Sequence, residues 1–144
     1  MREILFRGKT IDGDWTYGYY VFAPKRTGMF GQTISEADFD KHYILTMKYN
    51  LVKEINPETV GQDTGLTDKN GKKIFEGDIL AGALHWLEQK KNGVVTFRDG
   101  SFGLLWYRGE AEQFNAFTSM CNIVYEVIGN IHDNPELMKG GEEE

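Results

Sequence analysis

Short apolar runs separated by turn residues dominate the chain, and their spacing predicts strands. The most aromatic run is residues 15–22 (WTYGYYVF), and two more, 43–47 (YILTM) and 51–55 (LVKEI), precede the Asn56-Pro57 pair. Turn residues recur about every 8 to 12 positions, and no stretch sustains a helical period of about 3.6 residues. The pattern therefore predicts a mainly β fold.

Two short turns predict hairpins. Asp12-Gly13 precedes the aromatic run and indicates a hairpin with the first residues of the chain. Gly18, inside the aromatic run, indicates a bulge or a close backbone approach. Asp99-Gly100 is the whole spacer between two apolar runs, and it predicts the clearest hairpin in the sequence.

Three later segments are less regular. Residues 83–98 are interpreted as two strands joined at residues 89 to 93, with Asn92-Gly93 as the turn. Residues 109–121 are expected to hold a short helix or an irregular loop. Residues 122–131 (NIVYEVIGNI) are expected to form a final strand.

The elements suggest two β regions with a tail. Residues 1–58 are expected to form an N-terminal β-sheet region packed on a small SH3-like barrel. Residues 59–138 comprise a glycine-rich connector and that barrel, whose strands would lie within 74–131. The acidic segment 139–144 (KGGEEE) is expected to be a disordered tail.

The connector begins with residues 59–79 (TVGQDTGLTDKNGKKIFEGDI). Gly65 and Gly71 are expected to adopt positive φ. A calcium-binding EF-hand loop is excluded, because that alignment puts Leu66 and Gly77 where carboxylates are needed. The glycines also lack the spacing of a phosphate-binding loop, and no helix follows them.

Composition and charge narrow the setting. The formal net charge is −6, which opposes general attraction to nucleic acid. The single cysteine, Cys121, excludes an internal disulfide and favours a cytoplasmic protein. No apolar run approaches the roughly 20 residues of a membrane span, and the N-terminus lacks a signal-peptide stretch, so no membrane association is expected.

Candidate chemistry is sparse. His42, His85 and His132 are far apart and lack metal-ligand spacing, so no metal or cofactor is expected. Cys121 has no adjacent histidine to activate it, which favours a small core residue over a nucleophile. No catalytic residue is therefore assigned.

An enzyme remains an alternative, with its acid–base groups drawn from Asp63, Asp68, Glu76 and Asp78 beside the glycine turns. Glu76 and Asp78 are two residues apart and would share one face of a strand. A polar entrance to a strand is the favoured interpretation of that pair.

The aromatic run is the sharpest candidate for an interface. Trp15, Tyr17 and Tyr19 alternate onto one face of the strand, while Tyr20 and Phe22 take the other. A strand that is apolar on both faces lies either in a core or in a subunit contact. Both interpretations stay open, and the candidate interface comprises Trp15, Tyr17, Tyr19 and Tyr20.

Nucleic-acid binding is a further alternative. Lys90 and Lys91 are expected at a hairpin tip near Trp86 and Phe97, where cations and aromatic rings together suit a nucleic acid. Residues 25–30 (KRTGMF) are a second basic and aromatic cluster. Charged loop tips are usually only solvated, and the acidic balance of the chain disfavours this function.

Five sequence blocks are similar to the YopX family of phage and prophage proteins. They are residues 2–9, 15–20, 59–79, 93–97 and 127–137. One departure is Asp63, where the family often has tyrosine. The resemblance marks as family signature residues Thr59, Gly61, Thr64, Gly65, Asp68, Gly71, Glu76, Gly77 and Asp78.

The resemblance implies a small β-rich protein of phage genomes, in the cytoplasm of a bacterial host. It carries over no enzymatic activity, cofactor or catalytic residue, and it implies oligomer formation. The leading hypothesis is therefore a non-enzymatic homo-oligomer, acting by self-association or by contact with an unidentified phage or host protein.

Overall fold

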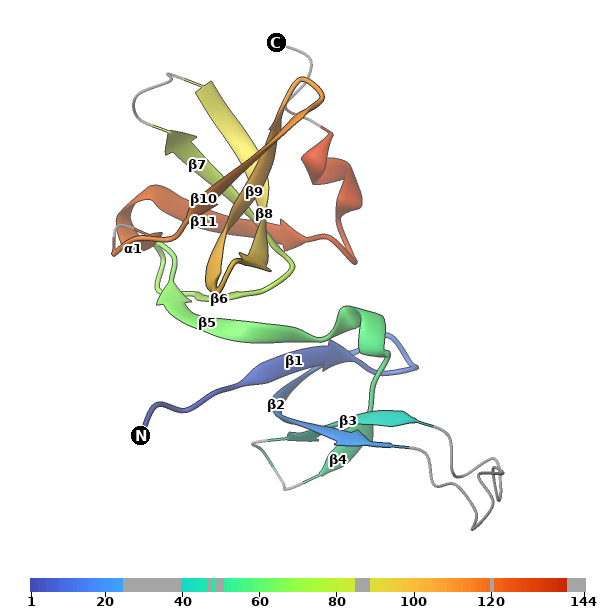
Figure 1. Cartoon of the computed structure of the whole chain (residues 1–144). Helices are drawn as coiled ribbons and strands as arrows, with labels where there is room; N and C mark the ends of the chain where they lie inside the picture. The colour runs from blue at the N-terminus through green and yellow to red at the C-terminus, as the bar shows by residue number, and fades with distance from the viewer. Residues whose placement is uncertain (25–39, 47, 49–50, 85–88, 120, 140–144) are drawn as a thin grey trace. The chain divides into compact units, whose positions relative to one another are not determined.

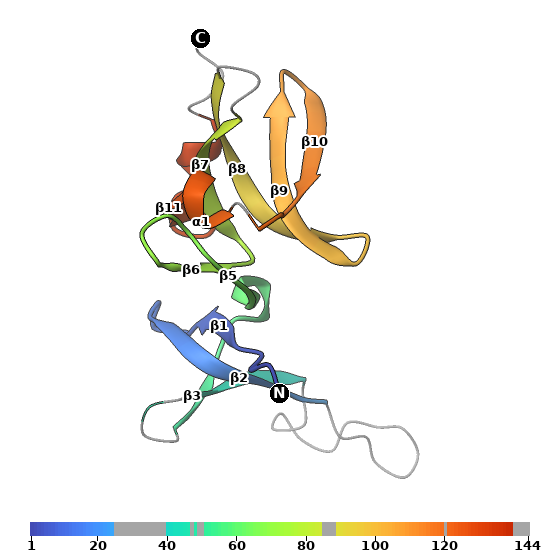
Figure 2. The same ribbon diagram turned by 90° about the vertical axis from the view of Figure 1, so that its left-hand side faces the viewer.

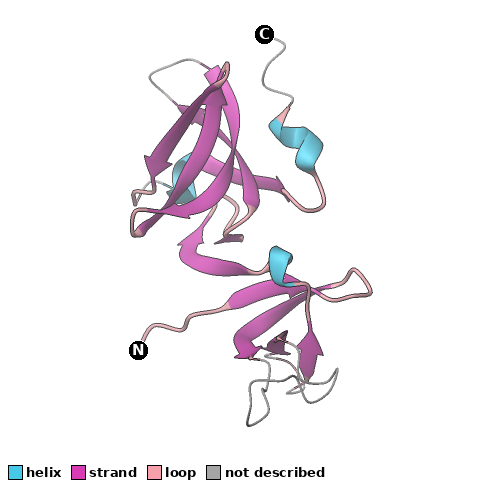
Figure 3. Cartoon of the chain, turned by 45° about the vertical axis from the view of Figure 1, so that its right-hand side comes forward, coloured by secondary structure: helices cyan, strands magenta, loops and turns pink. Residues whose placement is uncertain are grey.

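The computed structural model describes residues 1–24, 40–46, 48, 51–84, 89–119 and 121–139. The described chain is mainly β, with antiparallel pairing throughout, which confirms the predicted fold class. It divides into two compact units, Met1–Gln62 and Asp63–Glu144 (Figure 1). The helical segments are short (Figure 3), and none within the described ranges has the length and hydropathy to cross a membrane.

The first unit holds β4, β3, β2, β1 and the first two residues of β5, which belong to a six-stranded antiparallel sheet in the order β4-β3-β2-β1-β5-β6. The predicted hairpin is confirmed: β1 and β2 pair with Lys9 opposite Trp15, and Gly13 in the turn has a φ of 90°. The 3₁₀ turn η2 (Pro57–Thr59) precedes β5. The strands are β1 (Phe6–Lys9), β2 (Trp15–Ala23), β3 (Lys41–Thr46), β4 (Val52–Glu54) and β5 (Gly61–Thr67).

Burial in this unit centres on the inner side of β2 and β3. Ile44 and Ile55 are buried, and the Phe6 and Tyr20 rings lie 5.6 Å apart between their centroids. The close backbone approach expected at Gly18 is confirmed, because a β-carbon there would lie 1.9 Å from the backbone oxygen of Leu45. Glycine is therefore needed where β2 begins to pair with β3.

The second unit holds a five-stranded antiparallel sheet in the order β10-β9-β8-β7-β11 (Figure 2). Its core is formed by Ile74, Leu80, Val95 and Leu104. The unit's elements are β6 (Lys73–Phe75), β7 (Asp78–Leu84), β8 (Gln89–Arg98), β9 (Ser101–Arg108), β10 (Ala111–Ala116), α1 (Cys121–Val124), β11 (Tyr125–Asn130) and the 3₁₀ turn η3 (Pro135–Met138).

The sheet of the second unit is open as described. Five strands occupy the segment expected to form the SH3-like barrel, but β10 and β11 end the strand order, and no pairing within the described residues joins them. The all-β class is thus confirmed, while closure into an SH3-like barrel stays a prediction.

The turn predicted at Asn92-Gly93 is wrong. Both residues lie inside β8, and the chain instead reverses between Leu84 and Gln89, which pair with each other. Gly93 serves packing: a β-carbon there would lie 2.4 Å from Cγ of Leu104. A glycine that makes room for a core side chain has the same local sequence signal as a glycine in a turn.

The Asp99-Gly100 hairpin is confirmed, with φ values of 52° and 83° at the two residues. The helix or irregular loop expected at 109–121 is wrong over most of its length. Residues Ala111–Ala116 form β10, paired with β9, and helix begins only at Cys121. The tail 140–144 lies outside the described residues.

Candidate functional site

The strand β2 directs its side chains alternately to two faces. Thr16 and Gly18 are buried on the inner face, whereas Tyr17 is 48% exposed and Tyr19 is 41% exposed on the outer face. Trp15 belongs to the outer face and is half-buried. Three of the four candidate interface residues therefore share one face of the sheet.

Tyr20, the fourth candidate, lies on the inner face. Its hydroxyl is hydrogen-bonded with Nδ1 of His42, and its ring stacks on that imidazole. Phe22 lies opposite His42 in the ladder, with 4.9 Å between the ring centroids. Tyr20 is thus held by contacts inside the first unit and is separated from the other three aromatic residues.

Strand register extends the outer face into an apolar patch. Tyr19 lies opposite Leu45, which lies opposite Val52, and Val21 lies opposite Tyr43. Residues directly opposite each other in an antiparallel pair share a face. The apolar patch therefore comprises Tyr19, Val21, Tyr43, Leu45 and Val52, and Val52 at its β4 side is 61% exposed.

The other end of the same face is cationic. Arg7 lies opposite Tyr17, and Lys9 lies opposite Trp15. The guanidinium carbon of Arg7 lies 4.7 Å from the centre of the Trp15 ring, and Nζ of Lys9 lies 5.7 Å from it, both within cation–π range. Sequence reasoning missed this cluster, because it depends on how β1 aligns with β2.

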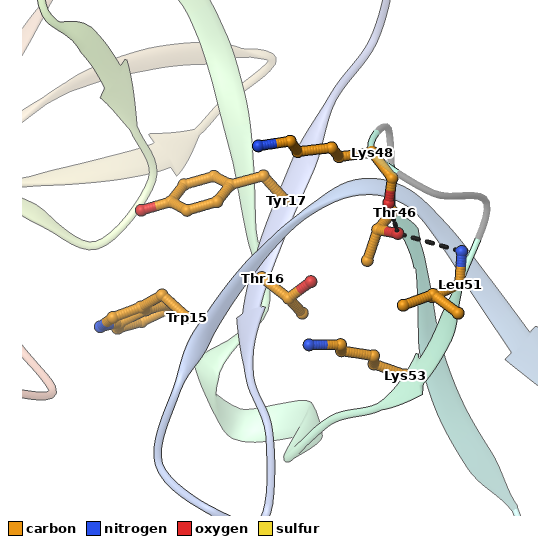
Figure 4. A pocket seen from close by; sticks show the side chains of 7 residues that line it. All are labelled: Trp15, Thr16, Tyr17, Thr46, Lys48, Leu51 and Lys53. Carbon is orange, nitrogen blue, oxygen red and sulfur yellow. Dashed lines mark hydrogen bonds between the residues drawn. The ribbon is translucent and has the colours of Figure 1, made fainter.

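A cavity of about 310 Å³ adjoins the cationic end (Figure 4). It opens where β3 stops pairing with β2, since their ladder begins at Gly18 opposite Thr46 and leaves Trp15 to Tyr17 without a β3 partner. We call it the notch. Its lining residues are Trp15, Thr16, Tyr17, Thr46, Lys48, Leu51 and Lys53.

Thr46 fixes the wall of the notch. Its hydroxyl donates to the backbone oxygen of Lys48 at 2.7 Å and accepts from the backbone N–H of Leu51 at 3.1 Å. Figure 4 shows Lys48 and Lys53 extending their ammonium groups toward β2, with Trp15 and Tyr17 projecting from that strand. Local hydrogen bonds thus fix the backbone of Lys48 and Leu51 beside an aromatic strand.

The signature residue Asp68 organises a turn of the second unit. It is 2% exposed, and its two oxygens accept from the backbone N–H groups of Asn70, Lys72 and Val127, each at 2.9 Å. Burial by itself raises the carboxyl pKa. The three N–H donors and the charge of Lys72 outweigh it, so the Asp68 pKa lies below its ordinary value.

The hydroxyls of two signature threonines also form hydrogen bonds with backbone groups. The Thr59 hydroxyl accepts from the N–H of Lys9 and donates to the oxygen of Asn56. The Thr64 hydroxyl donates to the oxygen of Ile74 at 2.8 Å. Gly61, also of the signature, is buried opposite Arg7. Both threonine hydroxyls therefore bond to backbone groups and help to shape the segment.

The predicted positive φ at two signature glycines is confirmed, with 82° at Gly65 and 79° at Gly71. Gly77 also has positive φ, and it bonds Val95 and Ile131 through its backbone. Glycine adopts this conformation without the steric cost that other residues incur. The connector glycines therefore have a geometric role.

The carboxylates considered as acid–base groups of an enzyme lie in different surroundings. Asp63 accepts from the N–H of Gly65 and pairs with Lys73 at 3.6 Å. Asp78 is buried and accepts from the N–H of Phe75 at 2.8 Å. The expectation that Glu76 and Asp78 share a strand face is wrong, because Glu76 lies in the turn before β7.

The basic residues proposed for nucleic acid are placed differently from the prediction. Lys90 and Lys91 lie within β8, not at a hairpin tip. Phe97 is six residues beyond Lys91 on that strand, about 20 Å away at 3.3 Å per residue. Trp86 and residues 25–30 lie outside the described residues. The structure therefore does not bring Lys91 and Phe97 together.

Metal ligands are not gathered in the described parts of the chain. No group of three or more His, Cys, Asp or Glu side chains there could hold a metal ion. His42 is engaged with Tyr20, as described above, and His132 donates its backbone N–H to Asn130. His85 lies outside the described residues, as does the side chain of Cys121.

Comparisons with known proteins give a family and a fold. The crystal structure of protein EF1440 from Enterococcus faecalis is similar to 96% of this chain over 99% of its own length, with a TM-score of 0.52 and 23% sequence identity. That likeness concerns the fold alone. A comparison with curated proteins gave no significant match. The family model described as YopX protein matches residues 19–139. Because this match covers most of the chain, the protein belongs to the YopX family.

Proposed function

We propose that the chain is a non-enzymatic protein of phage or prophage origin that self-associates in the cytoplasm of a bacterial host. The observation that carries the proposal is the apolar patch on the first unit. Tyr19, Val21 and Val52 each expose more than two fifths of their surface there. Exposed apolar side chains that are contiguous on one face typically mark an interaction site.

The patch suits a second copy of the same chain. Its residues come from three adjacent strands, β2, β3 and β4, so they form a continuous surface with a fixed register. A two-fold interface places the same surface on both partners, and an apolar surface is complementary to itself. Burial of this patch against its copy would remove apolar area from water and stabilise the dimer.

The non-enzymatic part of the proposal is supported by the hydrogen bonds of two signature acids. Asp68 and Asp78 accept backbone hydrogen bonds in buried positions. The backbone N–H donors lower the pKa of Asp68, so this carboxylate stays charged and is poorly placed to exchange protons near neutral pH. A structural role for Asp68 and Asp78 is therefore a simpler explanation than a catalytic one.

Light scattering coupled to size-exclusion chromatography tests the self-association. The wild-type chain, of 16.5 kDa, is expected to elute with a multiple of that mass. The double variant Tyr19→Ser/Val21→Ser removes two exposed patch residues and should elute as a monomer. A matched control, Tyr107→Ser, removes an exposed tyrosine of the second unit and should leave the mass unchanged.

A wild-type chain that stays monomeric at high micromolar concentration would overturn the self-association. An unchanged mass in the double variant would place the contact elsewhere. Circular dichroism of each variant verifies that the sheets remain folded, which separates a lost interface from a lost fold.

A further inference from the structure

We propose that the notch and the cationic end of the outer face bind single-stranded nucleic acid. The proposal goes beyond self-association and uses a different part of the first unit. In it, an unpaired base stacks on the exposed ring of Tyr17, and neighbouring phosphates contact Lys48 and Lys53. Aromatic rings beside a cationic groove are the general means by which proteins bind single strands.

The aromatic component is accessible. Tyr17 is 48% exposed and lines the notch. Trp15, its neighbour on the same face, has the guanidinium of Arg7 and the ammonium of Lys9 over its ring. Tyr17 is the more exposed of the two rings, since Trp15 is half-buried, so Tyr17 is the surface on which a base would stack.

The cationic component lies on both sides of the start of β2. Figure 4 shows the Lys48 ammonium on the side of Tyr17, and the Lys53 ammonium on the side of Thr16. Lys48 follows β3 and Lys53 lies in β4, and the Thr46 hydroxyl bonds the backbone of Lys48 and of Leu51. A strand that follows the notch would therefore meet cations along its backbone on either side.

The size of the notch fits one nucleotide at a time. Small-molecule sites span roughly 300–1,000 Å³, and this cavity, at about 310 Å³, is at the lower limit. It is open to solvent, as a site for a continuous strand must be. An open groove with one stacking platform predicts binding with little base preference.

The distribution of charge along the chain answers the objection that a net charge of −6 opposes nucleic-acid binding. Residues 1–62 contain eight Lys or Arg and eight Asp or Glu, whereas residues 63–144 contain eight and fourteen. The whole net charge of −6 therefore belongs to the second unit. The first unit is neutral. Four of its eight cations lie at the Trp15 ring or line the notch, namely Arg7, which is buried, and Lys9, Lys48 and Lys53.

Fluorescence anisotropy with a labelled oligothymidine of about 20 nucleotides tests the proposal on the full chain. At about 50 mM salt we expect saturable binding that weakens as salt rises. Tyr17→Ala should weaken binding by about 10-fold or more, and Tyr17→Phe should retain it. Lys48→Gln/Lys53→Gln should lower the slope of log affinity against log salt by about 1.4.

Two controls separate this site from the others. Lys91→Gln changes the basic residue that sequence reasoning favoured, and it should leave binding unchanged. Tyr19→Ser/Val21→Ser breaks the proposed self-association, and it should still bind the oligonucleotide. If that variant is monomeric and binds, both proposals stand. If the wild type is monomeric and binds, only self-association fails.

Three results would overturn the proposal. One is the absence of saturable binding at micromolar protein in low salt. Another is an unchanged affinity in Tyr17→Ala, verified as folded by its thermal transition. The third is labelled polyglutamate binding as tightly as oligothymidine, which would assign the notch to an acidic peptide.

Discussion

At the scale of single residues, Asp68 makes the most specific prediction. Asp68→Asn removes the charge that three backbone N–H groups share, and an amide nitrogen then faces one of those donors. We expect the free energy of unfolding to fall by about 3 kcal/mol at pH 7. Urea unfolding of both proteins measures it, with Asp99→Asn as a control, because Asp99 is exposed and asparagine tolerates its positive φ.

The effect should depend on pH in one direction. The Asp68 pKa is lowered from 3.8 in the folded protein. Its contribution to stability is therefore complete above that value and is lost as pH falls through the lower, folded pKa. The stability difference between wild type and Asp68→Asn should narrow below about pH 3.8. A difference that stayed constant down to acid unfolding would contradict a role for the charge.

At the scale of elements, the pairing of β2 with β3 depends on Gly18. Gly18→Ala places a β-carbon 1.9 Å from the backbone oxygen of Leu45, and a backbone atom cannot rotate away. We expect a loss of more than about 2 kcal/mol of unfolding free energy. Gly13→Ala, in open space but at positive φ, should cost about 1 kcal/mol.

Equilibrium unfolding in urea measures both glycine variants. Equal costs would indicate that β3 shifts to accommodate the methyl group. Because Gly18 opposite Thr46 is where the ladder begins, such a shift would also alter the notch. In that case Gly18→Ala should also weaken oligonucleotide binding in the fraction that folds.

At the scale of the whole molecule, the two units differ in charge and should differ in response to ligand. NMR amide shifts recorded during oligothymidine titration should move within residues 1–62, around Tyr17, Lys48 and Lys53. Shifts in residues 63–144 should stay small, because that unit carries the net negative charge and repels phosphate. Comparable shifts around Lys91 would contradict the assignment of the site to the first unit.

Part of this picture could be read from the sequence. The Asp99-Gly100 hairpin and the positive φ of Gly65 and Gly71 were predictable, because the preferences of glycine and of short turns act over neighbouring residues. The alternation of Trp15, Tyr17 and Tyr19 onto one face follows from the period of a strand. The segments similar to the YopX family likewise indicated the family that the comparison establishes.

The other features of the fold depend on pairing between segments that are distant in the sequence. Gly93 was misread as a turn because its role is to accommodate Leu104, a residue of another strand. The strand β10 was missed because its short, polar sequence depends on β9 for its conformation. In both cases a contact outside the local window decided the structure.

The sequence by itself determined the β class, the tight turns and the facing of side chains along β2, since these follow from local backbone preferences and the two-residue strand period. Only the tertiary structure decided which side chains lie together. Arg7 and Lys9 lie over Trp15 through the β1–β2 register, and the notch exists because β3 stops pairing at Gly18. Register and the ends of ladders are set by packing across the sheet, which no single strand specifies.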